Sequence, residues 1–217
     1  MTTETPNVDS LTGLHTRDAF AEALDQALAR ANTLTLGVIE SVKEPDMERL
    51  TQTYGREMGD GLLLGVTERL RPLAQQCDGF AARSFRTFWV ALPGVAVEAS
   101  ARQLEGLRAQ VAADSAAILP GVPDLHLSMS VGVANYPRDA RTGPDLLKRA
   151  DHALWEAKDA GEDRVVLAWP DEMAPKECYY AVRRLDQLKQ LAAAKNVRQS
   201  DLLREALDDF LSTASAT

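Results

Sequence analysis

Residues 147–161 read Leu147-Lys-Arg-Ala-Asp-His-Ala-Leu-Trp-Glu-Ala-Lys-Asp-Ala-Gly161. No glycine or proline interrupts this run before its last residue, and glycine is common just after the end of a helix. The sequence therefore predicts a helix over residues 144–159. A run of mostly apolar residues follows at positions 164–169, and it predicts a strand.

Helical and strand-like segments alternate through the chain before this helix. Helices are predicted over residues 18–31, 46–54, 60–73 and 97–113, and strands over residues 34–39, 79–84, 88–92 and 125–134. The strands at 79–84 and 88–92 form a hairpin around Phe85-Arg-Thr87. This order predicts an α/β (α+β) fold in which a sheet is covered by helices.

Composition sets limits on the class of protein. The chain has 217 residues, of which 45% are apolar and 26% are charged, so a wholly disordered chain is excluded. No apolar run approaches the ~20 residues that a membrane-spanning helix needs, and no secretory signal is visible. The two cysteines and three histidines have no metal-binding spacing. We therefore expect a cytoplasmic protein without a membrane segment, metal site or cofactor.

The last 42 residues form a separate segment. The polar run Pro170-Asp-Glu-Met-Ala-Pro175 predicts a linker, which gives domains at residues 1–169 and 176–217 joined by residues 170–175. The second domain is predicted to hold a strand at 177–183 and helices at 186–195 and 201–211. Roughly 40 residues cannot bury a sufficient core alone, so we expect this domain to fold as a homodimer.

Charge differs between the two segments. Residues 176–211 contain seven basic and six acidic side chains, or about +1, whereas the formal net charge of the whole chain is −8. The rest of the chain therefore carries about −9. Nucleic-acid binding needs a basic surface, so the C-terminal segment is the part of the chain that could provide it.

Four motifs in the first segment resemble the GGDEF family, whose active members join two GTP molecules into cyclic di-GMP. They are Asp9-Ser-Leu-Thr-Gly-Leu14 with Arg17, Tyr54-Gly-Arg-Glu-Met-Gly-Asp60, Ser128-Met-Ser-Val-Gly-Val-Ala134 and the helix at 147–161. The motifs occur in the family's order over about 160 residues. The resemblance implies the GGDEF fold for residues 1–169.

The residues that carry the family's chemistry are altered. An ungapped alignment puts Ser84, Phe85, Arg86, Thr87 and Phe88 in the G-G-D/E-E-F turn, so both glycines and both carboxylates of that turn are missing. Magnesium needs oxygen ligands and is repelled by a guanidinium group. We therefore expect no catalytic residues and no enzyme activity.

Other positions of the nucleotide site are partly retained. Thr51 replaces the guanine-binding Asn and Glu162 replaces a phosphate-binding Arg, while the candidates that remain for nucleotide binding are Glu40, Asp60 and Lys158. Asp60 could instead cap a helix, and Lys158 could instead favour a helix dipole. The product site R-x-x-D would end at Asp78 with Gln75 in place of its Arg, which removes a bidentate donor.

The C-terminal segment resembles the ribbon-helix-helix family of Arc, MetJ and CopG type. Residues 179–207 follow that family's pattern of a strand, a Leu-rich helix, and the element Ser200-Asp-Leu-Leu-Arg-Glu-Ala206. Strand alternation puts Tyr179, Ala181 and Arg183 on one face, toward DNA, and residues 178, 180 and 182 on the helices. The opposite register would bury Arg183.

The resemblance also implies contacts to the DNA backbone. Ser200 would cap the second helix, whose N–H groups could hold a phosphate, and Arg184, Lys195 and Arg198 would add phosphate contacts. A helical hairpin that serves only for dimerisation is the alternative for this segment.

Together these features predict a sequence-specific DNA-binding transcription regulator. Its partners would be DNA, a second copy of the chain through the C-terminal domain, and a guanine nucleotide effector of the inactive GGDEF-like domain. Two alternatives stay open: a weakly active diguanylate cyclase, and a non-catalytic cyclic di-GMP or GTP receptor that acts through protein partners.

Overall fold

The computed structural model describes residues 7–41, 44–122, 126–169 and 178–195, with positions 199, 200, 202, 203, 206, 207 and 210. The chain divides into two compact units, residues 1–172 and 173–217. The predicted linker lies outside the described residues. No helix in the described ranges has both the length and the apolar composition to cross a membrane.

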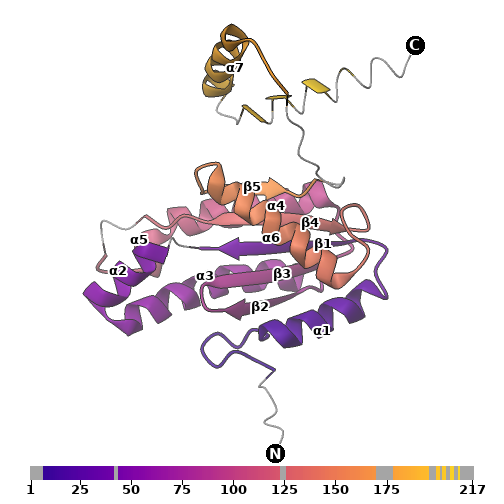
Figure 1. The fold of residues 1–217 in the computed structure, drawn as a ribbon. Helices are drawn as coiled ribbons and strands as arrows, with labels where there is room; N and C mark the ends of the chain where they lie inside the picture. The colour runs from indigo at the N-terminus through magenta and orange to yellow at the C-terminus, as the bar shows by residue number, and fades with distance from the viewer. Residues whose placement is uncertain are drawn as a thin grey trace, which may run out of the picture. The chain divides into compact units, whose positions relative to one another are not determined.

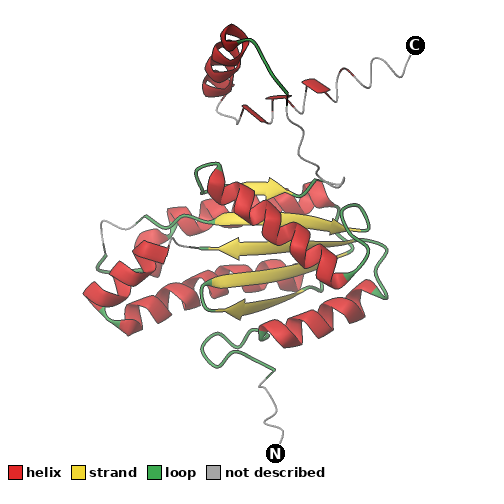
Figure 2. Ribbon diagram, viewed as in Figure 1, coloured by secondary structure: helices red, strands yellow, loops and turns green. Residues whose placement is uncertain are grey.

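The first unit is a five-stranded sheet with helices on both faces (Figures 1 and 2). Its helices are α1 (Arg17–Leu28), α2 (Glu44–Tyr54), α3 (Arg56–Gln76), α4 (Val97–Ala113), α5 (Ser115–Ile118) and α6 (Gly143–Asp159). Its strands are β1 (Leu34–Glu40), β2 (Phe80–Ser84), β3 (Thr87–Pro93), β4 (Ser130–Tyr136) and β5 (Val165–Leu167). The strand order is β2-β3-β1-β4-β5.

Strand β1 lies at the centre of the sheet. It pairs antiparallel with β3 and with β4, while β5 adds to β4 in parallel. Helices α1 and α6 pack with one apolar cluster that includes Phe20, Val38 and Leu154, and α3 and α4 pack with the other, which includes Ile39 and Leu70. Because successive strand residues point to opposite faces, Glu40 at the end of β1 faces the α6 side with Val38.

The predicted elements agree with the structure most closely at β1, α4 and α6 and least closely in three places. Helix α3 begins at Arg56, directly after Gly55 with its φ of 87°, so Asp60 lies inside the helix and its predicted role as a cap is wrong. Strand β4 begins at Ser130 rather than at residue 125. Helix α5 was not predicted.

The second unit contains helix α7 (Val182–Lys195). Residues 178–181 have no regular secondary structure, and Val182 and Arg183 are helical. The described part of the predicted strand, residues 178–183, is therefore not a strand in this single chain. A lone strand has no partner for its backbone hydrogen bonds. Gln199, Ser200 and the described positions from 202 to 210 are helical, so Ser200 is not the cap that begins the second helix.

Candidate functional site

Two basic side chains converge on one carboxylate oxygen at the end of β1. The Nζ of Lys158, in the last turn of α6, lies 2.8 Å from Oε2 of Glu40. The Nε of Arg86, in the turn between β2 and β3, lies 3.8 Å from the same oxygen. Their side chains are 39%, 23% and 17% exposed for Lys158, Arg86 and Glu40. The fold thus joins the predicted candidates Glu40 and Lys158, and it adds Arg86.

Asp151 and Arg17 extend this arrangement along α6 and α1. The pKa of the Asp151 carboxyl is raised because burial disfavours its charge and Glu40 lies near it, although Arg17 acts in the opposite direction. The guanidinium of Arg17 also lies over the ring of Trp89 in β3, 5.8 Å from the ring centre. We call Arg17, Glu40, Arg86, Asp151 and Lys158 the charged cluster.

The hairpin that carries Arg86 has a two-residue turn. Ser84 pairs with Thr87 and Arg83 with Phe88, so only Phe85 and Arg86 lie between the strands. The hairpin predicted with strands at 79–84 and 88–92 is formed, and the one difference at the turn is that Thr87 belongs to β3. Of the five aligned signature positions, Ser84, Thr87 and Phe88 are therefore strand residues. Phe88 is fully buried in the core, and its apolar side chain accounts for its place in β3.

Phe85 is both exposed and strained at the tip of this hairpin. Its side chain is 88% exposed, and its φ is 53°, in the left-handed region that favours glycine. Arg83 donates a short hydrogen bond from Nη1 to the carbonyl oxygen of Phe85. This contact holds the turn in a conformation that a phenylalanine rarely adopts.

Phe85→Gly is expected to stabilise the domain, because glycine adopts a positive φ without a Cβ penalty. The expected gain over Phe85→Ala is about 0.5–1 kcal/mol, since alanine keeps the strain. Urea unfolding followed by circular dichroism measures the difference. A glycine variant that is no more stable than the alanine variant would contradict the assignment of strain to Phe85.

Arg83 is itself held by the N-terminal motif. Its Nε lies 3.0 Å from Oδ1 of Asp9, and a second contact joins Nη2 to Oδ2. Asp9 also accepts hydrogen bonds from the backbone N–H and hydroxyl of Thr12. Burial favours the neutral acid, but the hydrogen bonds from Arg83 and Thr12 outweigh it and hold the pKa of Asp9 at about 2. Asp9 and Arg83 therefore position the turn that presents Arg86.

The predicted guanine-binding position Thr51 lies on α2, and the nucleotide-binding candidate Asp60 lies on α3. The hydroxyl of Thr51 donates to the carbonyl oxygen of Met47 at 2.9 Å, so it is used within its own helix. Asp60 has a side chain that is 38% exposed and lies 3.9 Å from Nε of Arg56. Of these two positions, Asp60 offers an exposed carboxylate that can accept hydrogen bonds from a base.

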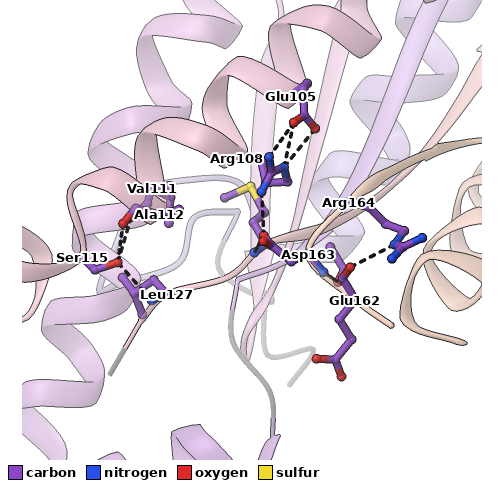
Figure 3. Close-up of polar contacts among 11 residues, drawn as sticks. Glu105, Arg108, Val111, Ala112, Ser115, Leu127, Glu162, Asp163 and Arg164 are labelled. Carbon is purple, nitrogen blue, oxygen red and sulfur yellow. Dashed lines mark hydrogen bonds and ion pairs between the residues drawn. The ribbon is translucent and has the colours of Figure 1, made fainter. Parts of the chain in front are cut away.

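Residues 161–163 connect α6 to β5 through an unusual backbone. Gly161, Glu162 and Asp163 have φ values of 107°, 63° and 47°. Asp163 accepts from Arg108 of α4 at 2.9 Å, and its N–H donates to the hydroxyl of Ser130 at 3.2 Å. Figure 3 shows the side chain of Glu162 extending away from the Arg108–Asp163 pair. Hydrogen bonds to α4 and β4 thus hold this connection in the left-handed region.

The magnesium ion that the resemblance implies does not fit these residues. Its ligands would be carboxylate oxygens, but Glu40 is ion-paired with two cations and the turn contributes a guanidinium group. Among the described residues, no three acidic, histidine or cysteine side chains are grouped to hold a metal.

The predicted DNA-binding residues lie in the second unit. Tyr179, Ala181, Arg183, Arg184 and Ser200 are exposed. The side chain of Lys195 and all of Arg198 lie outside the described residues. In the single chain Tyr180 and Val182 are 49% and 75% exposed, so the predicted alternation, which requires a second copy of the chain, stays a prediction.

Three residues near the site were not among the predicted site residues: Arg17, Arg83 and Asp151. Arg17 and Asp151 occur in the quoted motifs, which was a usable signal. No sequence signal pointed to Arg83, because its partner Asp9 lies 74 positions earlier. The ion pair of Glu40 with Lys158 spans 118 positions and likewise depends on the tertiary fold.

Comparisons with known proteins agree on the first unit. A family model described as the diguanylate cyclase GGDEF domain matches residues 6–164. The chain is 34% identical over 161 residues to the diguanylate cyclase DgcP of Pseudomonas aeruginosa, covering 74% of this chain and 24% of that protein. It is 30% identical over 162 residues to the response regulator PleD of Caulobacter vibrioides, and the match covers 73% of this chain and 35% of that protein.

Solved structures give the same result. The GGDEF domain of DgcB from Caulobacter crescentus, in complex with c-di-GMP, superposes with a TM-score of 0.65 and 26% identity, covering 77% of this chain and 96% of that one. The chain thus spans about a quarter to a third of the length of the two curated relatives and nearly the whole of the isolated domain.

Proposed function

Since this chain belongs to the GGDEF family, we propose that it is a non-catalytic receptor for guanine nucleotides in cyclic di-GMP signalling, rather than a cyclase. The observation that carries this proposal is the contact of Arg86 and Lys158 with the single carboxylate Glu40. A cyclase must neutralise the phosphates and activate a 3′-hydroxyl, and phosphoryl transfer of this kind uses metal ions held by carboxylates. Arg86 and Thr87 supply no carboxylate.

The side chains at the site support binding without turnover. Lys158 and Arg86 can take phosphate oxygens through charge-assisted hydrogen bonds, and Asp60 can accept from the N1–H and amino group of guanine. At the position of the product site, Gln75 lacks the guanidinium fork that grips a guanine or phosphate in a bidentate manner. These features favour a mononucleotide such as GTP over cyclic di-GMP.

The test of this function is a turnover assay with the full chain. GTP and Mg²⁺ are expected to give no cyclic di-GMP above a no-enzyme control, whereas a GGDEF domain with an intact turn is active under the same conditions. Calorimetric titration with GTP is expected to give measurable heat. If cyclic di-GMP forms faster than in the control and this activity disappears in Glu40→Ala, the protein is a weakly active cyclase instead. If neither GTP nor cyclic di-GMP gives heat, the domain is a scaffold that binds no nucleotide.

A second candidate function, sequence-specific DNA binding as a dimer, is favoured by the exposed side chains of the second unit. Its described residues include the exposed Tyr179, Arg183 and Arg184, and apolar side chains that one copy leaves in water. These apolar residues are Val182, Leu185, Leu191, Leu203, Leu207 and Phe210. A second copy could cover them and pair with residues 178–181, which would form the two-stranded ribbon that fits a major groove.

Binding of genomic fragments by the chain with and without residues 173–217 tests this candidate. Arg183→Ala is expected to relax sequence preference, and Lys195→Ala is expected to weaken binding to all sequences and to flatten its salt dependence. If Arg183→Ala changes neither affinity nor preference, or if the chain is monomeric, this candidate function is wrong.

A further inference from the structure

We propose that the charged cluster takes the phosphate groups of a guanine nucleotide without a divalent cation, and that Arg86 occupies the role that the family gives to magnesium. This inference rests on the proposed receptor function and concerns how the ligand is held. It follows from the disagreement between the implied metal ion and the residues that the fold brings together.

The charged cluster contains more basic than acidic side chains. Arg17, Arg86 and Lys158 face Glu40 and Asp151, so the cluster has three cations and two carboxylates. Such a site repels a second positive ion and attracts a polyanion, because the interaction of charges at these distances is strong where water is partly excluded.

Two basic side chains meet at one oxygen of Glu40. The Nζ of Lys158 at 2.8 Å and the Nε of Arg86 at 3.8 Å both approach one oxygen, Oε2. The position of Oε2 is therefore one in which a single anionic oxygen lies between two cations. A phosphate oxygen has the same charge and donor preference, and guanidinium groups bind phosphate bidentately. A nucleotide phosphate can therefore replace Glu40 between Arg86 and Lys158.

Lys158 and Arg86 are accessible to a ligand, and the turn that carries Arg86 is held in place. The partial exposure of Lys158 and Arg86 lets a ligand approach both side chains. Arg86 also sits on a short turn that the Asp9–Arg83 pair holds through the carbonyl oxygen of Phe85. A cation placed on a rigid turn loses less conformational freedom on binding. Arg86 can therefore neutralise phosphate charge at a fixed position, as a bound metal ion would.

The experiment compares binding of GTP to the full chain in excess Mg²⁺ and in EDTA, by calorimetry. The dissociation constants are expected to agree within about twofold. Arg86→Ala is expected to weaken binding about tenfold or more in both buffers, as loss of a charge-assisted contact does. Arg86→Asp is expected to abolish binding in EDTA and to restore part of it with Mg²⁺, because a carboxylate returns to the turn.

Arg102→Ala is the matched control, since this exposed arginine lies on α4, which packs on the opposite face of the sheet from α6. Its affinity for GTP is expected to equal that of the parent. Circular dichroism shows that each variant is folded.

The outcomes separate the two proposals. Binding that requires Mg²⁺ overturns metal-free recognition and leaves the receptor function standing. Binding in EDTA that Arg86→Ala does not change overturns the role of Arg86. Absence of GTP binding in both buffers overturns this inference, and absence of heat with cyclic di-GMP as well overturns the receptor function. Conversion of GTP to cyclic di-GMP overturns the non-catalytic assignment.

Discussion

Gly132→Ala is expected to unfold most of the protein or to lower its free energy of unfolding by about 4 kcal/mol or more. Gly132 lies in β4 directly beneath α6. A Cβ there would lie 2.1 Å from the carbonyl oxygen of Ala150 and 2.1 Å from the N of Leu154. These are backbone atoms of a helix, so no side chain can rotate away, and the helix must move off the sheet.

Gly106→Ala is the matched control for this prediction. Gly106 lies within α4, and a Cβ there meets no heavy atom within 4 Å. Alanine is favoured over glycine in a helix interior, so this variant is expected to gain about 0.5–1 kcal/mol. Denaturant unfolding followed by circular dichroism measures the free energy of unfolding of both variants. If Gly132→Ala loses no more than 1 kcal/mol, the close crossing of α6 over β4 is wrong.

Arg83→Ala is expected to cost about 2–3 kcal/mol, because it leaves the Asp9 carboxylate, only 17% exposed, without its guanidinium partner. The loss must depend on pH. The folded-state pKa of Asp9, about 2, lies below its unfolded value, so the pair stabilises the fold above about pH 4 and the contribution disappears as the pH falls toward 2.

Urea unfolding of the parent and of Arg83→Ala between pH 2 and pH 5 measures this dependence. The difference between the two is expected to shrink on acidification. Asp9→Asn combined with Arg83→Ala is expected to cost less than the sum of the single changes, because the buried charge is removed with its partner. Arg102→Ala, with an exposed side chain, is expected to stay within about 0.5 kcal/mol of the parent. Additive effects would show that Asp9 and Arg83 are not coupled.

The sequence predicted the elements whose pattern is local. Helix α6 and strand β1 were placed to within a residue or two, because uninterrupted helical and buried-strand patterns are strong signals. The GGDEF resemblance is confirmed for the first unit. The start of α3 was missed because Gly55 with a positive φ ends one helix and permits the next, which a search for apolar stripes does not detect.

The site was harder to predict because its contacts are distant in sequence. The substitutions at Arg86 and Thr87 were readable, but the length of the turn depends on the pairing of Ser84 with Thr87, and an ungapped alignment cannot reveal it. The convergence of Lys158 and Arg86 on Glu40 requires α6, β1 and the hairpin to meet. In the second unit, strand propensity over residues 178–181 did not produce a strand, since a strand also needs a neighbour.

The ion pairs around Glu40 also affect the ligand-free domain. A pocket built from carboxylates is under mutual repulsion until a counter-ion arrives, whereas here acidic and basic groups neutralise one another within the chain. We therefore expect chelation of divalent ions to leave the melting temperature of the domain unchanged.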